Sequence, residues 1–244
     1  MNTERRALYE GKAKIIFPGP DPDSVVQYFK DDITAFNSQK KDVLPGKGTI
    51  NNRTSYLLLQ YLENHGVKTH LLGLLNDREQ LVRRVDMIPM EIVVRNLAYG
   101  GFCTRFNVTQ GEPISPPVVE CYYKNDALSD PMMTEDHVVS LKLATRNEVD
   151  YIKAESLRIN AILSAMMREI NIVLADFKLE FGRLRQARGE IILADEISPD
   201  TCRLRNSSDN AALDKDVYRL GTGDTLYGYA EVLRRIEEHL PSRS

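Results

Sequence analysis

Residues 176–200 combine charge with strand-forming residues in a way that restricts the possible folds. Along the first half of this segment, Asp176, Lys178 and Glu180 alternate with two phenylalanines and a leucine. Successive side chains of a strand point to opposite faces, so the three charges share one face and the apolar residues pack on the other. The segment therefore predicts the first strand of a β-hairpin that carries charge on one side.

A second, mostly apolar strand follows and ends at two acidic residues. If the turn centres near residues 186–187, Lys178 and Glu180 lie beside Leu193 and Asp195 of this partner strand. Two carboxylates and an ammonium then share a surface that suits a divalent cation bound to a polyphosphate, because Mg²⁺ usually takes only one or two protein carboxylates. Taken alone, the hairpin favours the simpler alternative, a solvated face with alternating charges.

Composition excludes several classes of protein. The 244 residues are enough for one large domain or for two small lobes around a cleft. A net charge of −3 argues against non-specific nucleic-acid binding. Three cysteines without a CxxC spacing argue for a reduced cytosolic setting and against a zinc site or a disulfide framework. We find no leader-like or bilayer-spanning segment, so we expect a soluble cytoplasmic protein with no membrane partner.

Short apolar runs between turn residues predict a β-rich first third, with strands at residues 13–17, 25–29, 71–75, 80–85 and 91–96. A helix with Asn51 or Asn52 near its N-cap separates the second and third of these strands, and Gly66 follows its end. The break at Asp86–Pro89 predicts a hinge. We therefore divide the chain into an N-terminal lobe, residues 1–86, and a C-terminal lobe, residues 87–244.

The second half is predicted to be mixed. Asn147 is a candidate N-cap for a long helix with apolar residues near helical spacing, and a last helix starts near Asp224. A strand is expected over Val118–Tyr123. None of the four histidines pairs with Ser, Cys or a carboxylate at useful spacing, which argues against a hydrolytic triad.

Two glycine-containing segments are candidate anion sites. Gly11, Lys12 and Lys14 precede a strand, where glycine allows close approach of a phosphate and lysines supply charge, although no Walker A motif is present. Alone, this segment fits an ordinary charged turn.

Arg95 stands where a core strand gives way to a loop, and Gly100 and Gly101 are placed to open a short helix. A structural salt bridge from Arg95 to an acidic neighbour fits equally well. After the hairpin, Asp200 and Arg203 add a carboxylate and a guanidinium, although a polar loop explains them as well. Together these segments provide what a two-lobed ATP-using enzyme needs.

Several motifs resemble those of the SAICAR synthetase family: YEGKAKIIF, GTINN, LVRRVDMIPMEIVVRN, KNDALSDP, DFKLEFG and ADEISPDTCRL. They follow the family's order from about Leu8 to Leu233. The resemblance implies an α+β, two-lobed fold related to ATP-grasp enzymes, with antiparallel sheets and flanking helices around an ATP cleft. It also implies ligation of L-aspartate to the carboxylate of CAIR, a carboxylated aminoimidazole ribonucleotide, through an acyl phosphate, in de novo purine biosynthesis. The family further suggests a homodimer.

The resemblance also implies roles at the nucleotide end. Gly11, Lys12 and Lys14 would cover the ATP phosphates, and Met87 would lie at the adenine hinge. Lys178 would touch phosphate or the developing acyl phosphate, which makes Lys178 and Lys14 the expected catalytic residues.

Glu180 and Asp195 would hold Mg²⁺, with Asp176 in a supporting role. At the substrate end, the CAIR phosphate would be held by Arg95 and Arg203 with Gly100 and Gly101, and Asp200 would lie near the aminoimidazole.

Two positions depart from the family pattern. Gly101 stands where many members carry serine, and Asn37 where many carry an acidic residue. Neither change removes a metal ligand or a phosphate lysine, so we expect an active enzyme. The alternatives are a small-molecule kinase, for which no HRD-like loop is present, and a non-catalytic nucleotide-binding module, which would not need all of these charged residues.

Overall fold

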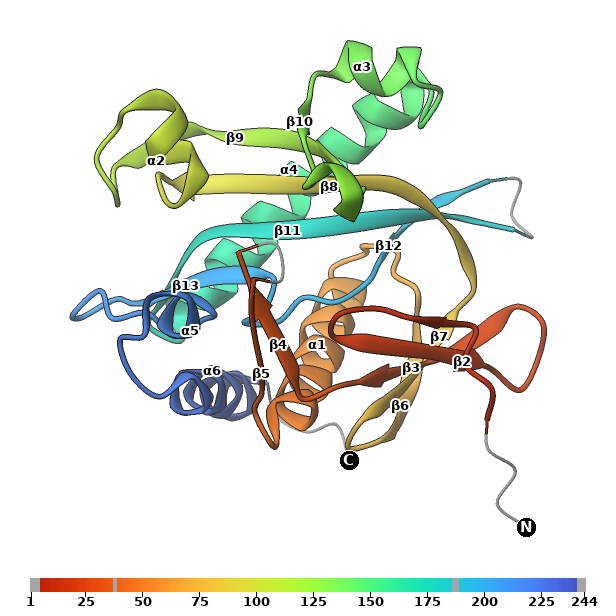
Figure 1. Cartoon of the computed structure of the whole chain (residues 1–244), viewed down its shortest axis with the longest axis horizontal. Helices are drawn as coiled ribbons and strands as arrows, with labels where there is room; N and C mark the ends of the chain where they lie inside the picture. Colours follow the sequence, from red (N-terminus) through yellow and green to blue (C-terminus); the bar gives the residue numbers. More distant parts are fainter. Residues whose placement is uncertain (1–4, 37–38, 186–188, 241–244) are drawn as a thin grey trace.

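A computed structural model describes residues 5–36, 39–185 and 189–240 of the chain, and it contains two antiparallel sheets with helices packed on them (Figure 1). The first sheet has the order β1-β2-β3-β7-β6. Its strands are β1 (Tyr9–Glu10), β2 (Lys14–Pro18), β3 (Ser24–Phe29), β6 (Leu71–Asn76) and β7 (Glu79–Arg83). Helix α1 (Lys47–Asn64) packs against this sheet and also against α6 (Thr225–His239).

The second sheet has the order β10-β9-β8-β11-β12, and β13 also pairs with β11. Its strands are β8 (Val85–Leu97), β9 (Pro113–Tyr123), β10 (Met132–Met133), β11 (Ile172–Leu184), β12 (Ile191–Ala194) and β13 (Cys202–Asn206). The 24-residue helix α4 (Arg146–Glu169) packs on β11, and their apolar side chains form the main core with α1 and α6. The remaining short helices are α2 (Gly101–Phe106), η1 (Asp126–Leu128), α3 (Glu135–Ser140) and α5 (Asp216–Leu220).

A two-stranded ribbon, β4 (Asp32–Ala35) and β5 (Lys40–Val43), stands apart from both sheets. It packs on α5 through a small separate apolar cluster that contains Ile33, Ala35 and Tyr218. Lys40 donates a hydrogen bond to the Tyr218 carbonyl oxygen at 2.7 Å, which ties the ribbon to the helix a second time. The ribbon and α5 therefore form one wall.

The α+β class, the predicted strands and the last helix are confirmed, and Asp224 caps that helix as expected. The starts of the other two long helices are wrong. Helix α1 begins after Gly46, where the Asp31 carboxylate accepts a hydrogen bond from the Gly48 amide at 2.9 Å. Helix α4 begins after Thr145, whose capping box with Glu148 satisfies the first turn.

The strand break predicted at Asp86–Pro89 is also wrong, because these residues lie within the continuous strand β8. Met87 pairs with Gly182 and Glu91 with Glu180, so β8 has two more residues than β11 between these pairs. Pro89 lies in that irregularity, where its missing N–H costs no regular ladder bond.

The hairpin register differs by one residue from the prediction: Glu180 pairs with Ala194, and not with Leu193. Turn length sets hairpin register, and the expected turn centre near residues 186–187 lies outside the described part of the chain. No helix of the described residues is both long and apolar enough to cross a bilayer.

Candidate active site

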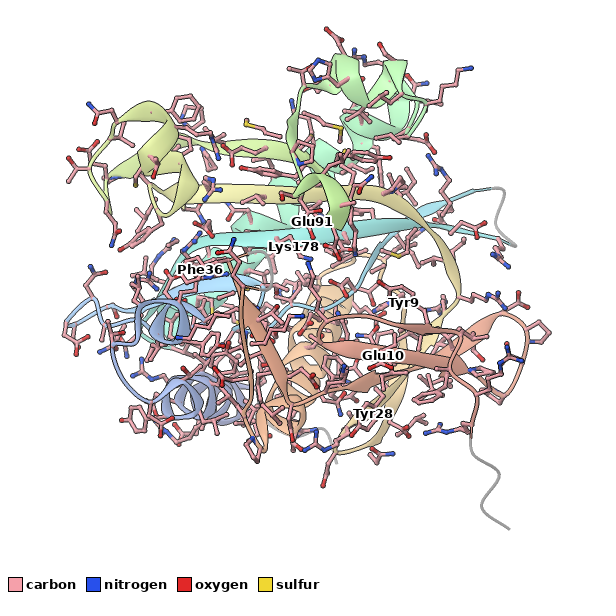
Figure 2. The ribbon with its side chains drawn as sticks, in the orientation of Figure 1. Tyr9, Glu10, Tyr28, Phe36, Glu91 and Lys178 are labelled. Carbon is pink, nitrogen blue, oxygen red and sulfur yellow. The ribbon has the colours of Figure 1, made fainter. Side chains whose placement is uncertain are left out.

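A cavity of about 700 Å³ is lined by residues from both sheets, from the β4–β5 ribbon and from α5. One part of its lining is apolar and includes Leu8, Ile16, Val25, Val82 and Val85. Met87 adds a side chain that is 42% exposed. Tyr9 and Phe36 also line the cavity, and both side chains are exposed (Figure 2). A flat apolar ring fits this part of the cavity.

His70 is a polar residue that also lines the cavity. It is buried at 4% exposure, and burial lowers its pKa to about 4. The imidazole is therefore neutral at pH 7 and adds no charge here.

The centre of the cavity is a cluster of lysines and carboxylates. Lys178 Nζ lies 2.6 Å from Glu180 Oε1, 2.9 Å from Glu91 Oε1 and 3.6 Å from Asp195 Oδ2 (Figure 2). Lys124 forms a second ion pair with Glu180. Glu180 is buried, so the solvated-face alternative for this hairpin is wrong.

Lys14 adds a third ammonium, which pairs with Asp195 and lies 2.9 Å from Glu196 Oε1. Burial alone would lower the pKa of Lys14, but the two carboxylates outweigh it and raise the pKa above its usual value. Burial opposes ionisation of Asp195 too, yet Lys14 and Lys178 hold its pKa well below the usual range. The backbone of Asp195 is left-handed, with φ 63°, where the chain leaves β12. Lys14 and Asp195 are therefore both charged at neutral pH.

The cluster is compatible with Mg²⁺, although it is not a metal site by itself. Among the described residues, no group of three or more His, Cys, Asp and Glu side chains is arranged to hold an ion. Glu180 and Asp195 both line the cavity and share Lys178 as a partner. Because Mg²⁺ commonly binds one or two carboxylates plus substrate phosphates, this pair fits a metal that arrives with a nucleotide.

Asp200 is held by three donors at another part of the cavity wall. Its carboxylate accepts hydrogen bonds from Lys47 Nζ at 2.5 Å, Asn51 Nδ2 at 2.8 Å and Tyr229 Oη at 2.6 Å. Burial opposes ionisation, but Lys215 and Lys47 keep the pKa of Asp200 below its usual range. Asp200 is therefore a fixed anion and a poor proton acceptor.

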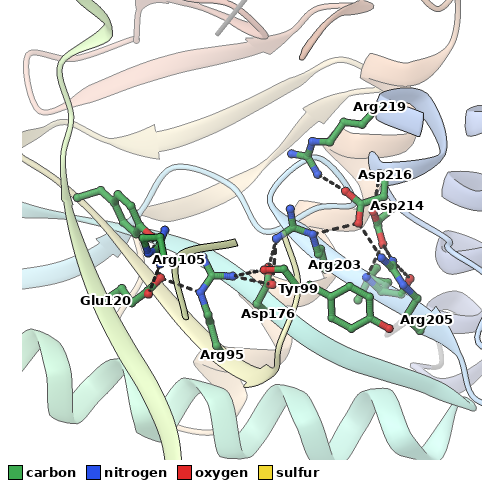
Figure 3. Close-up of polar contacts among 12 residues, drawn as sticks. Arg95, Tyr99, Arg105, Glu120, Asp176, Arg203, Arg205, Asp214, Asp216 and Arg219 are labelled. Atoms are coloured by element: carbon green, nitrogen blue, oxygen red, sulfur yellow. Dashed lines mark hydrogen bonds and ion pairs between the residues drawn. The ribbon is translucent and has the colours of Figure 1, made fainter. Parts of the chain in front are cut away.

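The predicted phosphate arginines lie in a second, arginine–aspartate network (Figure 3). Arg95 donates to Glu120 at 2.7 Å and to Asp176 at 3.0 Å, which confirms the salt-bridge alternative. Arg203 donates from Nη1 to Asp176 at 3.0 Å and from Nε to Asp216 at 3.0 Å. Asp176 therefore joins the two arginines.

The network extends through Asp216 to Arg205, which donates to this carboxylate at 2.6 Å and also pairs with Asp214. Burial raises the pKa of Asp214 to about 6 despite Arg205. Arg205 lies over the Tyr99 ring, with its guanidinium carbon 4.5 Å from the ring centroid.

The glycine pair lies beside this network. Gly100 has φ 55° and precedes α2, as predicted. A Cβ atom at Gly100 would come within 2.6 Å of Arg203 Nη2, so the close approach requires glycine.

The cavity brings together most of the predicted site. Eight predicted residues line it: Gly11, Lys12, Lys14, Met87, Lys178, Glu180, Asp195 and Asp200. Four do not: Arg95, Gly100, Gly101 and Arg203. Asn37 lies outside the described residues.

Sequence reasoning missed several charged residues of the site, among them Lys47, Glu91, Lys124, Glu196, Lys215 and Arg219. Lys124 opens the KNDALSDP motif, which could have indicated it, whereas no local pattern indicated Lys215.

Comparison with known proteins identifies the family. The SAICAR synthetase profile matches residues 7–236. A phosphoribosylaminoimidazole-succinocarboxamide synthase from Caulobacter vibrioides is 48% identical, over 97% of this chain and 94% of its own length. A homologue from Acidiphilium cryptum carrying the same enzyme name is 51% identical, over 95% and 92%.

Solved structures of similar proteins support the same family. The synthase from Ehrlichia chaffeensis superposes with a TM-score of 0.94 at 49% identity, covering 97% of this chain and all of that one. A SAICAR synthetase solved in complex with ADP gives a TM-score of 0.91 at 42% identity, covering 96% and 99%. The chain therefore belongs to the SAICAR synthetase family.

Proposed function

We propose that this chain is an ATP-dependent ligase that joins L-aspartate to the carboxylate of CAIR, giving SAICAR, ADP and phosphate in purine biosynthesis. Family membership and the relatives named for this activity support the reaction. The structural observation that carries it is the Lys178 cluster in the cavity, where three lysines meet four carboxylates. A related structure that holds ADP supports nucleotide use.

The chemistry requires two displacements. An oxygen of the CAIR carboxylate attacks the γ-phosphorus of ATP and ADP leaves, which gives an acyl phosphate. The aspartate amine then attacks the acyl carbon, phosphate leaves, and the nitrogen loses a proton. Both steps depend on positioning and on neutralising phosphate charge, which Lys14 and Lys178 supply from the cavity wall. Lys12 and Gly11 would cover the phosphates, and the apolar lining beside Met87 would take the adenine.

Glu180 and Asp195 would hold Mg²⁺ together with phosphate oxygens, and the ion would neutralise charge that builds on the transferred group. In the structure their carboxylates pair with lysines. Those ammonium groups would move onto the nucleotide phosphates when the carboxylates bind the ion.

The ribose phosphate of CAIR would bind at Arg203 and the amides of Gly100 and Gly101. Arg203 is the better placed of the two predicted arginines, because its Nη2 lies next to Gly100. Arg95 would contribute chiefly by fixing Asp176, which in turn holds Arg203. Asp200 would approach the aminoimidazole from the cavity wall.

A coupled assay tests the function. ADP release in the presence of ATP, Mg²⁺ and CAIR should give SAICAR only when L-aspartate is added, and omission of Mg²⁺ should abolish turnover. Asp195→Asn and Glu180→Gln should each lower kcat/KM at least about 100-fold. Glu10→Gln, at an exposed pair with Lys30, is the matched control and should stay near wild type.

Two outcomes would contradict the proposal. Phosphorylated CAIR as the final product would indicate a kinase, and full activity of both carboxylate variants would remove the metal assignment. A cytoplasmic homodimer is part of the proposal, and light scattering should give twice the 27.7 kDa mass of one chain.

A further inference from the structure

One part of the cavity has cations that its own side chains do not fully neutralise. Besides Ala35 and Asp32, whose carboxylate lies 3.5 Å from Lys30 Nζ, the wall made by the β4–β5 ribbon and α5 contributes four side chains to the cavity lining: Thr34, Phe36, Lys215 and Arg219. The separate apolar cluster around Tyr218 holds this wall together. The nucleotide chemistry proposed above uses none of these four side chains.

Lys215 is a buried ammonium without a close partner. Its side chain is 15% exposed, and its one ion pair within the described residues is to Asp200 Oδ1 at 3.9 Å. Asp200 already accepts three short hydrogen bonds from other side chains, so its negative charge is shared and does not neutralise Lys215 alone. Burial lowers the pKa of Lys215. By contrast, Lys14, with the same 15% exposure, pairs closely with two carboxylates.

Arg219 is also under-neutralised. Its Nη1 donates to Asp216 Oδ1 at 2.7 Å. The same carboxylate accepts from Arg203 at 3.0 Å and from Arg205 at 2.6 Å. Three guanidiniums therefore share one carboxylate, although Arg203 and Arg205 have further aspartate partners. Lys215 and Arg219 together leave positive charge at this part of the cavity (Figure 3 shows Arg219 and Asp216).

A short turn connects this wall to the Lys178 cluster. The Thr201 carbonyl oxygen accepts from the Lys178 amide at 2.9 Å, and the Pro199 carbonyl oxygen accepts from the Lys215 amide at 3.2 Å. Both lysines line the same cavity, so an anion at Lys215 would share it with the lysine proposed to act on the acyl phosphate.

We propose that Lys215 and Arg219 bind the two carboxylates of L-aspartate and so present its amine to the acyl carbon. This inference rests on the proposed function. An amino-dicarboxylate fits two under-neutralised cations, and the polyphosphate and the ribose phosphate already have separate cationic sites at Lys14 and Arg203. A buried ammonium without a close anion lowers stability, so a bound carboxylate explains its presence.

Initial-rate kinetics on Lys215→Met and Arg219→Gln, varying each substrate in turn, test the inference. The KM for L-aspartate should rise roughly 10- to 100-fold, the cost of a lost charged hydrogen bond, while the KM values for ATP and CAIR stay within about twofold. Arg219→Lys keeps the charge and should recover part of the loss. The melting temperature of Lys215→Met should equal or exceed that of wild type, because no close ion pair is broken.

Isotope exchange within labelled ATP, measured with CAIR and without L-aspartate, should persist in both variants because acyl phosphate formation does not need the amine. Lys40→Met is the matched control: Lys40 belongs to the same wall but contacts Tyr218, so its L-aspartate KM should not change.

An unchanged L-aspartate KM in both variants, or a rise confined to the CAIR KM, would overturn the inference and leave the proposed function intact. Wild-type protein that makes no SAICAR would instead contradict the proposed function and the inference with it.

Discussion

The Lys178 cluster and the arginine–aspartate network handle buried charge differently. The first consists of lysines and carboxylates that line the cavity. The second consists of arginines held on two sides, as Arg203 is by Asp176 and Asp216, and most of it lies behind the cavity surface.

The difference follows from the side chains. A lysine ammonium on a flexible stem can exchange a carboxylate for a phosphate, whereas a guanidinium fork held at two edges keeps its direction. We infer that the cluster rearranges during the reaction and that the network keeps a fixed geometry.

Lys178→Met should produce the largest effect on catalysis. We expect kcat/KM to fall by about 100- to 1000-fold, because one charged donor to the transferring phosphoryl group is lost. Unfolding in urea should show a smaller stability loss than that of Arg95→Met, because the Lys178 side chain is 24% exposed and that of Arg95 only 6%. Lys68→Met, which removes an exposed ion pair with Glu190 outside the cavity, is the control. Near-wild-type activity of Lys178→Met would contradict the catalytic role that we assign to the Lys178 cluster.

Arg95→Met should produce the largest effect on stability. Glu120 and Asp176 lose a buried partner, which typically costs about 3–5 kcal/mol of unfolding free energy. Urea titration measures this loss. The KM for CAIR should also rise, because Asp176 no longer fixes Arg203, while the KM for ATP should not. A cost below about 1 kcal/mol would mean that the network is not rigid.

Glu148→Gln tests an ion pair outside both regions. Hydrogen bonding from Arg183, with help from Thr145, lowers the pKa of Glu148 to about 2 against the opposing effect of burial. A depressed carboxyl pKa stabilises the fold above the unfolded value near 4.5 and loses that contribution as pH falls through about 2. The variant should lose about 1–2 kcal/mol at pH 7, and the two stability curves should converge near pH 2. Activity at pH 7 should be unchanged; curves that stay parallel would contradict the assignment.

Lys12→Gln should have the smallest effect on stability. Lys12 pairs with Asp126 at 2.6 Å across the cavity rim, and both side chains are exposed, so the loss should stay below about 1 kcal/mol. The KM for ATP should nevertheless rise several-fold. Asp126→Asn is the partner variant and should leave the ATP KM near wild type, because it removes no phosphate donor.

Strand positions could be predicted from the sequence because alternation and turn residues act locally. Proline, glycine and aspartate at residues 18–23, between the first two predicted strands, are typical of a turn, and these strands pair as the β2–β3 hairpin. The start of α1 could not, because the Asp31 carboxylate that supports it comes from another element. The start of α4 was available in principle, since Thr145 and Glu148 have capping-box spacing, which the choice of Asn147 missed.

The residues of the site also divide into those that local sequence could predict and those that depend on distant parts of the chain. Lys14, Lys178, Glu180 and Asp195 could be assembled from adjacent strands and family motifs. Lys47 could not, because its partner Asp200 lies 153 residues away. Spacing also did not show that Arg95 would use its donors on two carboxylates.

Strand β8, which runs unbroken past Pro89, also sets a molecular length. Met87 beside the apolar lining and Arg95 in the arginine network are eight residues apart on this one strand. Because β8 is irregular at Pro89, the separation follows from their partners on β11, Gly182 and Asp176, which are six residues apart, or roughly 20 Å at about 3.3 Å per residue. One residue more or less in β8 would exchange the faces to which the later side chains point. The distance between Met87 and Arg95 is thus set by the one strand that contains both residues. A rearrangement of the loops around the cavity would leave this distance unchanged.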